Sequence, residues 1–144
     1  MLKIADFGFA APTEGRDGKG FLTTKLGTRG YMAPELYTKQ PYDGARVDVF
    51  SAGVILFCML SGHPPFTEAI AADPFYKSLV GGRADIFWKY HSKSKPNGEA
   101  FYSEEFRDLV ASMLALKPTE RPSINTILDH PWMKQDIASN EEVL

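Results

Sequence analysis

Asp6, in the tripeptide Asp6-Phe7-Gly8, is the side chain with the clearest chemical use in this chain. Its carboxylate is a hard oxygen ligand of the kind that Mg²⁺ prefers. The three histidines lack the spacing of metal ligands. Cys58 lies inside an apolar run, where a thiol is inert packing rather than a nucleophile. A carboxylate at this position could ligate a cation, and the alternative is a loop aspartate without a chemical role.

The elements that would position this carboxylate are mainly helical. Residues 104–114 have apolar side chains at helical spacing behind a cap at Ser103, and Asp73 before Pro74 marks another helix start. We expect helices over 47–60, 74–80, 85–90, 104–114 and 124–128, a helical turn at 34–37, and loops over 12–20, 39–44 and 93–98. In the last helix, Ile124, Ile127 and Leu128 should face inward. The alternation over residues 2–5 predicts one short strand.

Composition bounds the class of protein. The chain has 144 residues, 44% hydrophobic and 24% charged, which suits one globular domain. A net charge of −2 gives no general attraction to nucleic acid or acidic membranes. The single cysteine favours a reducing, intracellular and cytoplasmic setting. The start of the chain lacks the apolar stretch of a signal peptide, and the 49–60 apolar run suits a core helix better than a membrane span.

Several short motifs follow one another in a fixed order. They are DFG at 6–8, APE at 33–35, DVFSAG at 48–53, GHPPF at 62–66, KPTERPS at 117–123 and HPW at 130–132. Together they resemble the eukaryotic serine/threonine protein kinases over residues 2–133, with some similarity to the calmodulin-dependent-kinase-like group. The resemblance implies a mainly α portion of the C-terminal lobe. It divides the chain into a partial kinase domain at 1–133, with the activation segment at 6–35 and a helical subdomain at 36–133, and a tail at 134–144.

The resemblance implies roles for residues of the activation segment. Asp6 would hold Mg²⁺ on the phosphates of ATP, Phe7 would pack into the core, and Gly8 would supply an unusual backbone angle. Thr28 would help to position the substrate hydroxyl, although it could also be a plain loop threonine.

A modification site is implied as well. Thr24 matches the usual activation-loop phosphorylation position, with Thr23 as the fallback, and an upstream kinase would add the phosphate. Ala11 departs from relatives that have a phosphate-binding lysine there. An unmodified loop residue is the alternative.

Three further residues have implied structural roles. Glu35 and Arg121 resemble the family's buried ion pair, which ties the activation segment to the later helices. Asp48 would hydrogen-bond the catalytic loop, or alternatively cap its own helix. Phe50 stands where a tryptophan is common.

Other parts of a kinase are not found in this sequence. It has no G-x-G-x-x-G, and no histidine is followed by Arg-Asp. We therefore expect no phosphoryl transfer by the chain alone. We also expect an apolar face on the 47–60 helix, which normally needs neighbours on all sides, to make the chain poorly soluble or dimeric.

Two classes of function stay open. In the first, the chain is part of an ATP- and Mg²⁺-dependent kinase that acts on protein substrates. In the second, it is a non-catalytic docking or dominant-negative binding module, or a pseudokinase fragment. The basic and aromatic stretch at 87–95 could stack on nucleic acid, but core aromatics with solvated lysines, or a docking neighbourhood for substrates and regulators, are better interpretations.

Overall fold

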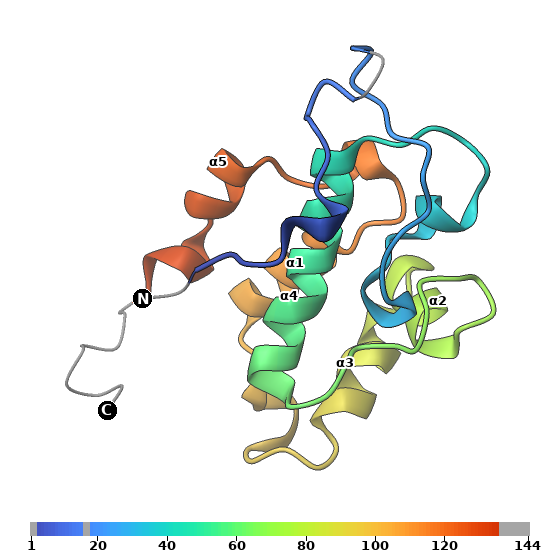
Figure 1. Cartoon of the computed structure of the whole chain (residues 1–144). Coiled ribbons are helices and arrows are strands. Elements are labelled where there is room, and N and C mark those ends of the chain that lie inside the picture. The colour runs from blue at the N-terminus through green and yellow to red at the C-terminus, as the bar shows by residue number, and fades with distance from the viewer. Residues whose placement is uncertain (1–2, 16–17, 136–144) are drawn as a thin grey trace.

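The computed structural model describes residues 3–15 and 18–135, and these ranges contain five α-helices, arranged as Figure 1 shows. The α-helices are α1 (Gly44–Ser61), α2 (Pro74–Val80), α3 (Ala84–Ser92), α4 (Glu104–Met113) and α5 (Ile124–Leu128). Single 3₁₀ turns occupy Phe7–Phe9, Arg29–Tyr31, Pro34–Tyr37, Gly98–Phe101, Pro118–Glu120 and Pro131–Lys134. The prediction of a mainly helical fold is confirmed.

Helix α1 runs through the middle of the molecule and is longer than the sequence pattern predicts. The carboxylate of Asp43 accepts hydrogen bonds from the backbone of the first turn, so the helix begins at Gly44. Phe50, Val54 and Phe57 are fully buried on its inner side. Gly53 allows α4 to approach closely, because a Cβ atom there would lie 2.9 Å from the Cβ of Met113.

The smaller helices start where the sequence places caps. The side chains of Asp73, Ser103 and Ser123 each accept a hydrogen bond from the first turn of α2, α4 and α5 respectively. Around α1 these elements enclose an aromatic core. Its buried rings are those of Phe50, Phe57, Phe66, Tyr76, Phe87, Trp88, Tyr102 and Phe106. The aromatic residues Phe87 and Trp88 are therefore core residues and cannot serve as a stacking surface.

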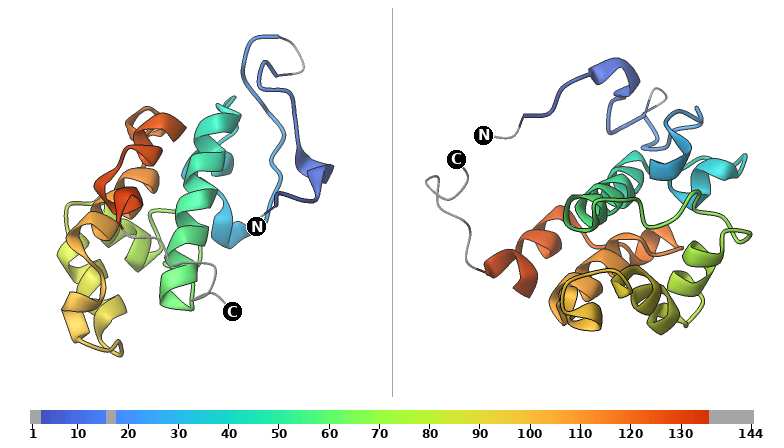
Figure 2. Two further views of the ribbon diagram at one scale, coloured as in Figure 1. Left: turned by 90° about the vertical axis from the view of Figure 1, so that its left-hand side faces the viewer. Right: turned by 90° about the horizontal axis from the view of Figure 1, so that it is seen from below.

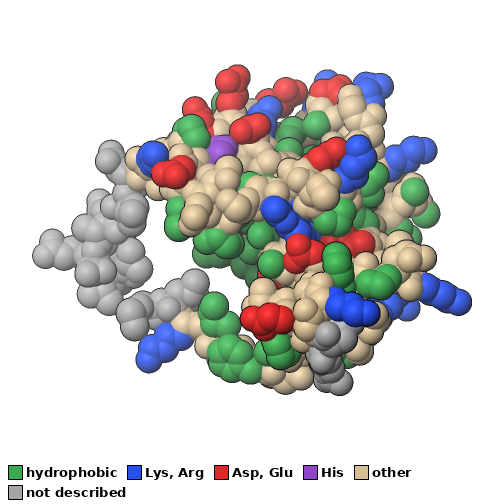
Figure 3. Space-filling view, turned by 90° about the horizontal axis from the view of Figure 1, so that it is seen from above, with side chains coloured by type: hydrophobic (Ala, Val, Ile, Leu, Met, Phe, Trp, Pro, Cys, Tyr) green, Lys and Arg blue, Asp and Glu red, His purple; other side chains and the backbone are tan. Residues whose placement is uncertain are grey.

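One side of α1 remains open. Met59 is 77% exposed, and Ile55 and Leu60 are also exposed. By length and composition α1 could span a membrane, with a mean hydropathy of 1.5, but a core helix passes the same test and a third of this one is buried inside the fold. The space-filling view shows exposed apolar side chains interspersed with charged ones on the upper face (Figure 3).

Two sequence expectations are wrong. Residues 3–5 are exposed and irregular, because no neighbouring chain in the described ranges offers them a hydrogen-bonding ladder, and the first two residues lie outside those ranges. In the views of Figure 2 this N-terminal stretch stands apart from the helical body. Ile124 and Leu128 point to solvent, since the five-residue α5 reaches the core cluster through Ile127.

Candidate functional site

Asp6 adopts an unusual backbone conformation that aims its carboxylate back at the chain. Its φ of 62° is left-handed, and its Oδ1 accepts a hydrogen bond from the N–H of Gly8 at 3.2 Å. Aspartate tolerates this conformation because its side chain bonds locally. The sequence predicts the unusual backbone angle at Gly8. In the structure, Asp6 has this angle instead. The other carboxylate oxygen makes no hydrogen bond within the described residues.

Phe7 does not pack into the core. Its side chain is 70% exposed, and Phe9 is equally open. The expectation that Phe7 is buried is wrong for this chain, because none of its described elements lies over the ring.

Thr28 and Asp48 face the same cavity. This cavity has a volume of about 400 Å³ and lies between the 26–32 stretch, the first turns of α1 and the chain at 9–13. Thr28 is exposed and precedes the 3₁₀ turn at Arg29–Tyr31, and its side chain does not cap that turn. Ser51 holds the turn in place, because its hydroxyl donates to the carbonyl oxygen of Tyr31 at 2.9 Å.

Asp48 is not a helix cap. It lies in the second turn of α1, and the cap is Asp43. The surrounding protein removes water from the Asp48 carboxylate and so raises its pKa above the ordinary value. Burial, and then the negative charge of Asp48, raise the pKa of the nearby Tyr42 hydroxyl. The Asp48 carboxylate makes no hydrogen bond or ion pair within the described residues.

The loop that carries Thr23 and Thr24 is held to the rest of the chain by contacts with Tyr42. Leu22 and Tyr42 form an isolated antiparallel bridge with two backbone hydrogen bonds of 2.9 Å. The hydroxyl of Tyr42 also donates to the carbonyl oxygen of Thr24 at 2.6 Å. Both threonine side chains are exposed, and a modifying enzyme can therefore reach their hydroxyls.

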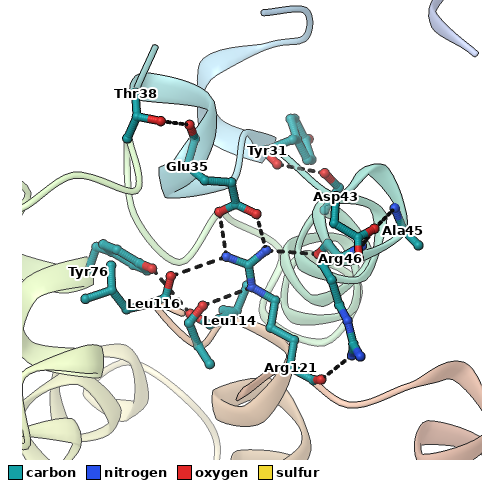
Figure 4. A network of polar contacts seen from close by, with 12 residues as sticks. Tyr31, Glu35, Thr38, Asp43, Ala45, Arg46, Tyr76, Leu114, Leu116 and Arg121 are labelled. Carbon is teal, nitrogen blue, oxygen red and sulfur yellow. Dashed lines mark hydrogen bonds and ion pairs between the residues drawn. The ribbon is translucent and has the colours of Figure 1, made fainter. Parts of the chain in front are cut away.

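Glu35 and Arg121 form a bidentate ion pair at the centre of a polar network (Figure 4). The two nitrogen–oxygen distances are 2.6 and 2.7 Å. The same guanidinium donates to the carbonyl oxygens of Ala115, Arg46 and Leu116. It also lies over the ring of Phe50, 4.9 Å from the centroid. The pair therefore joins the 33–37 turn to the stretch between α4 and α5.

The comparisons with known proteins identify the family. The protein kinase domain family matches residues 1–133. The chain belongs to the protein kinase family. Its mainly helical fold is consistent with a fragment of the C-terminal lobe of a kinase domain.

The curated relatives are longer kinases from plants. CBL-interacting protein kinase 30 of Oryza sativa subsp. japonica is 39% identical over 134 residues, which cover 93% of this chain and 25% of the relative. CBL-interacting serine/threonine-protein kinase 5 of Arabidopsis thaliana is 35% identical over 135 residues, covering 94% of this chain and 27% of the relative. The chain thus spans about a quarter of the length of the relatives it matches.

Sequence reasoning missed two features of the site region. The helix cap at Asp43 could have been found, because aspartate before glycine and alanine is a common helix start. The stacking of His63 on His91 could not have been predicted, because the two rings meet only after α1, α2 and α3 pack together. Their ring centroids are 5.2 Å apart and nearly parallel.

Proposed function

We propose that this chain is part of an ATP-dependent serine/threonine kinase that phosphorylates protein substrates inside the cell. The observation that supports this most is the kinase-family match over residues 1–133 together with serine/threonine kinase relatives. The Thr28-to-Glu35 segment is held on the helical body by Ser51 and Arg121, as a substrate platform requires. Positioning of this kind is the main contribution of a kinase to phosphoryl transfer.

Each site residue then has a role. Asp6, with one carboxylate oxygen unused, fits a ligand of Mg²⁺ on ATP, and Phe7 and Gly8 set its position. Bound Mg²⁺ supplies charge stabilisation at the transferred phosphoryl group. Thr28 orients the substrate hydroxyl, and Asp48 accepts hydrogen bonds from the catalytic loop of the longer protein. The chain alone lacks the catalytic-loop motif and does not transfer phosphate.

The test is to read the messenger RNA upstream of the Met1 codon and express the extended protein. We expect an in-frame extension that encodes a lysine-bearing strand and H-R-D-x-x-x-x-N. Phosphate transfer from ATP to a protein substrate should then fall by about a hundredfold or more in Asp6→Asn. The matched control is Asp85→Asn on the outer surface of α3, which should keep full activity. Equal activity of Asp6→Asn and the unmodified protein would remove the proposal.

Phosphorylation of Thr24 by an upstream kinase completes this proposal. The exposed hydroxyl in a loop fastened by Tyr42 is a place where a phosphate could order the activation segment. Mass spectrometry of the active extended protein should find phosphate on Thr24, or on Thr23 if the register differs. Active protein with both threonines unmodified would contradict the idea.

A second candidate function is a docking module without catalysis, or a pseudokinase fragment. One observation favours it: the elements that would hold a protein partner, from Tyr31 to α3, are already formed around the buried core of this chain. A stop codon and a true 5′ end directly before Met1 would make this the leading function.

A further inference from the structure

Tyr31 lines a second groove as well as the Thr28 cavity. Its volume is about 890 Å³, and the 62–67 loop and α3 form its walls. The lining includes Pro65, Phe75 and Tyr90, which give it an apolar base. His63, His91 and Lys93 are its titratable basic groups.

His91 is an unusual side chain to find at the base of a groove. It is only 5% exposed, and its two buried ring nitrogens make no hydrogen bond of normal geometry within the described residues, although the Pro65 carbonyl oxygen lies near the ring. Buried polar atoms without partners are rare, because each costs its full desolvation free energy. His63 stacks on its face, and Lys95 also acts on it electrostatically. Burial, followed by the charges of His63 and Lys95, lowers the pKa of His91 to about 4, although the Pro65 carbonyl opposes this.

The histidine and charged side chains that line the groove around the His63 and His91 rings are all basic. No aspartate or glutamate is among the described residues that line the groove. The acidic residues that flank it in sequence are already engaged: Glu68 pairs with Arg29 at 3.0 Å. Asp73 accepts four backbone hydrogen bonds around the start of α2. The groove therefore offers donors and positive charge that no side chain of the described fold neutralises.

We propose that this groove binds a segment of a partner protein that carries an aspartate or glutamate side chain, with the carboxylate held by the exposed His63 and Lys93 beside the buried His91. The flanking apolar residues of the segment pack on Pro65, Phe75 and the exposed Tyr90. The negative charge of a bound carboxylate favours the protonated form of the stacked His63 and His91 pair. The binding needs no phosphoryl transfer and is independent of the proposed kinase activity.

The test uses the 144-residue chain and two fluorescent peptides. In one peptide Asp and Glu alternate with Val and Leu, and in the other Asn and Gln replace the acids. Fluorescence anisotropy should show that the acidic peptide binds at least about tenfold more tightly. Its affinity should rise as the pH falls from about 8 to about 6, since the carboxylate draws a proton onto the histidine pair.

Variants locate the binding. Lys93→Glu should weaken the acidic peptide by about tenfold or more, while Lys39→Glu, the same charge change at an exposed site outside the groove, should not. His63→Gln and His91→Phe should weaken it and remove its pH dependence. His63 is exposed, so its variant remains informative if His91→Phe fails to fold.

Three results would overturn the proposal. The first is equal affinity for the acidic and amide peptides. The second is equal weakening by Lys93→Glu and Lys39→Glu, which would mean non-specific charge attraction. The third is displacement of the peptide by a single-stranded oligonucleotide whose own binding depends on Lys93, which would assign the groove to nucleic acid.

Discussion

Removal of the Arg121 side chain should bring this fold close to unfolding. The side chain of Arg121 has no exposed surface, and that of Glu35 is only 14% exposed. The guanidinium makes five hydrogen bonds, two to Glu35 and three to backbone carbonyl oxygens. Arg121→Ala leaves the Glu35 carboxylate unpaired in a largely dry site, which costs about 3–5 kcal/mol. Domains of this size are stable by about 5–15 kcal/mol, so the variant loses a large part of the total.

Urea denaturation followed by circular dichroism measures this loss directly. We expect the midpoint for Arg121→Ala to fall sharply, or the variant to be unfolded without urea. Arg121→Lys keeps the charge but cannot make the bidentate pair and the three carbonyl bonds together, and it should lie between the two. The matched control is Arg83→Ala, which removes an exposed ion pair with Asp85 and should leave the midpoint unchanged.

The alternative outcome has a clear meaning. A change of less than about 1 kcal/mol for Arg121→Ala would show that the buried pair adds little to the fold. Glu35→Gln would then be equally mild. A double-mutant cycle on the two residues separates their coupling from the loss of packing on Phe50.

Three other predictions concern stability and association. The pKa of His91 is about 4 in the folded chain, against an ordinary value of 6.5. Between these pH values the unfolded state binds a proton on His91 that the folded state does not bind. The free energy of unfolding should therefore fall by about 3 kcal/mol as the pH drops from 6.5 to about 4. In pH-dependent urea titrations His91→Phe should lose this part of the slope, and an unchanged slope would refute the assignment. Gly53→Ala should lower the melting temperature, with a cost of about 1–3 kcal/mol, because the new methyl group meets Met113; a higher melting temperature would contradict the packing. The double substitution Ile55→Lys and Met59→Glu should convert self-associated chain into monomer in analytical ultracentrifugation. If the unsubstituted chain is already a monomer, the exposed apolar side of α1 does not drive self-association.

Local chemistry was enough to predict most of the helices. Asp73 and Ser103 mark the starts of α2 and α4 because a short polar side chain there satisfies free backbone N–H groups. The predicted start of α1 is three residues late, because its first turn contains Gly44 and the charged Arg46 and lacks apolar periodicity. Apolar periodicity therefore locates the middle of a helix better than its ends.

Burial was harder to predict than helix position. Phe7 and Leu128 are as apolar as the core residues, yet both are exposed, because burial depends on which elements lie opposite. The motif pattern predicted that Glu35 and Arg121 belong together and that Asp6 could bind a cation. It carried no information on the pairing of His63 with His91, since neither local propensity nor any short motif links those rings.

The ion pair between Glu35 and Arg121 also sets an order of events during synthesis. The two residues are separated by 86 positions in the chain. At about 5–20 residues per second a ribosome needs roughly 4 to 17 seconds to make the stretch between them. During that time the 33–37 turn lacks the arginine that fixes it, and the turn stays loose until Arg121 has been made. A truncation before Arg121 would therefore disorder a segment near the opposite end of the sequence, while leaving the residues of that segment untouched.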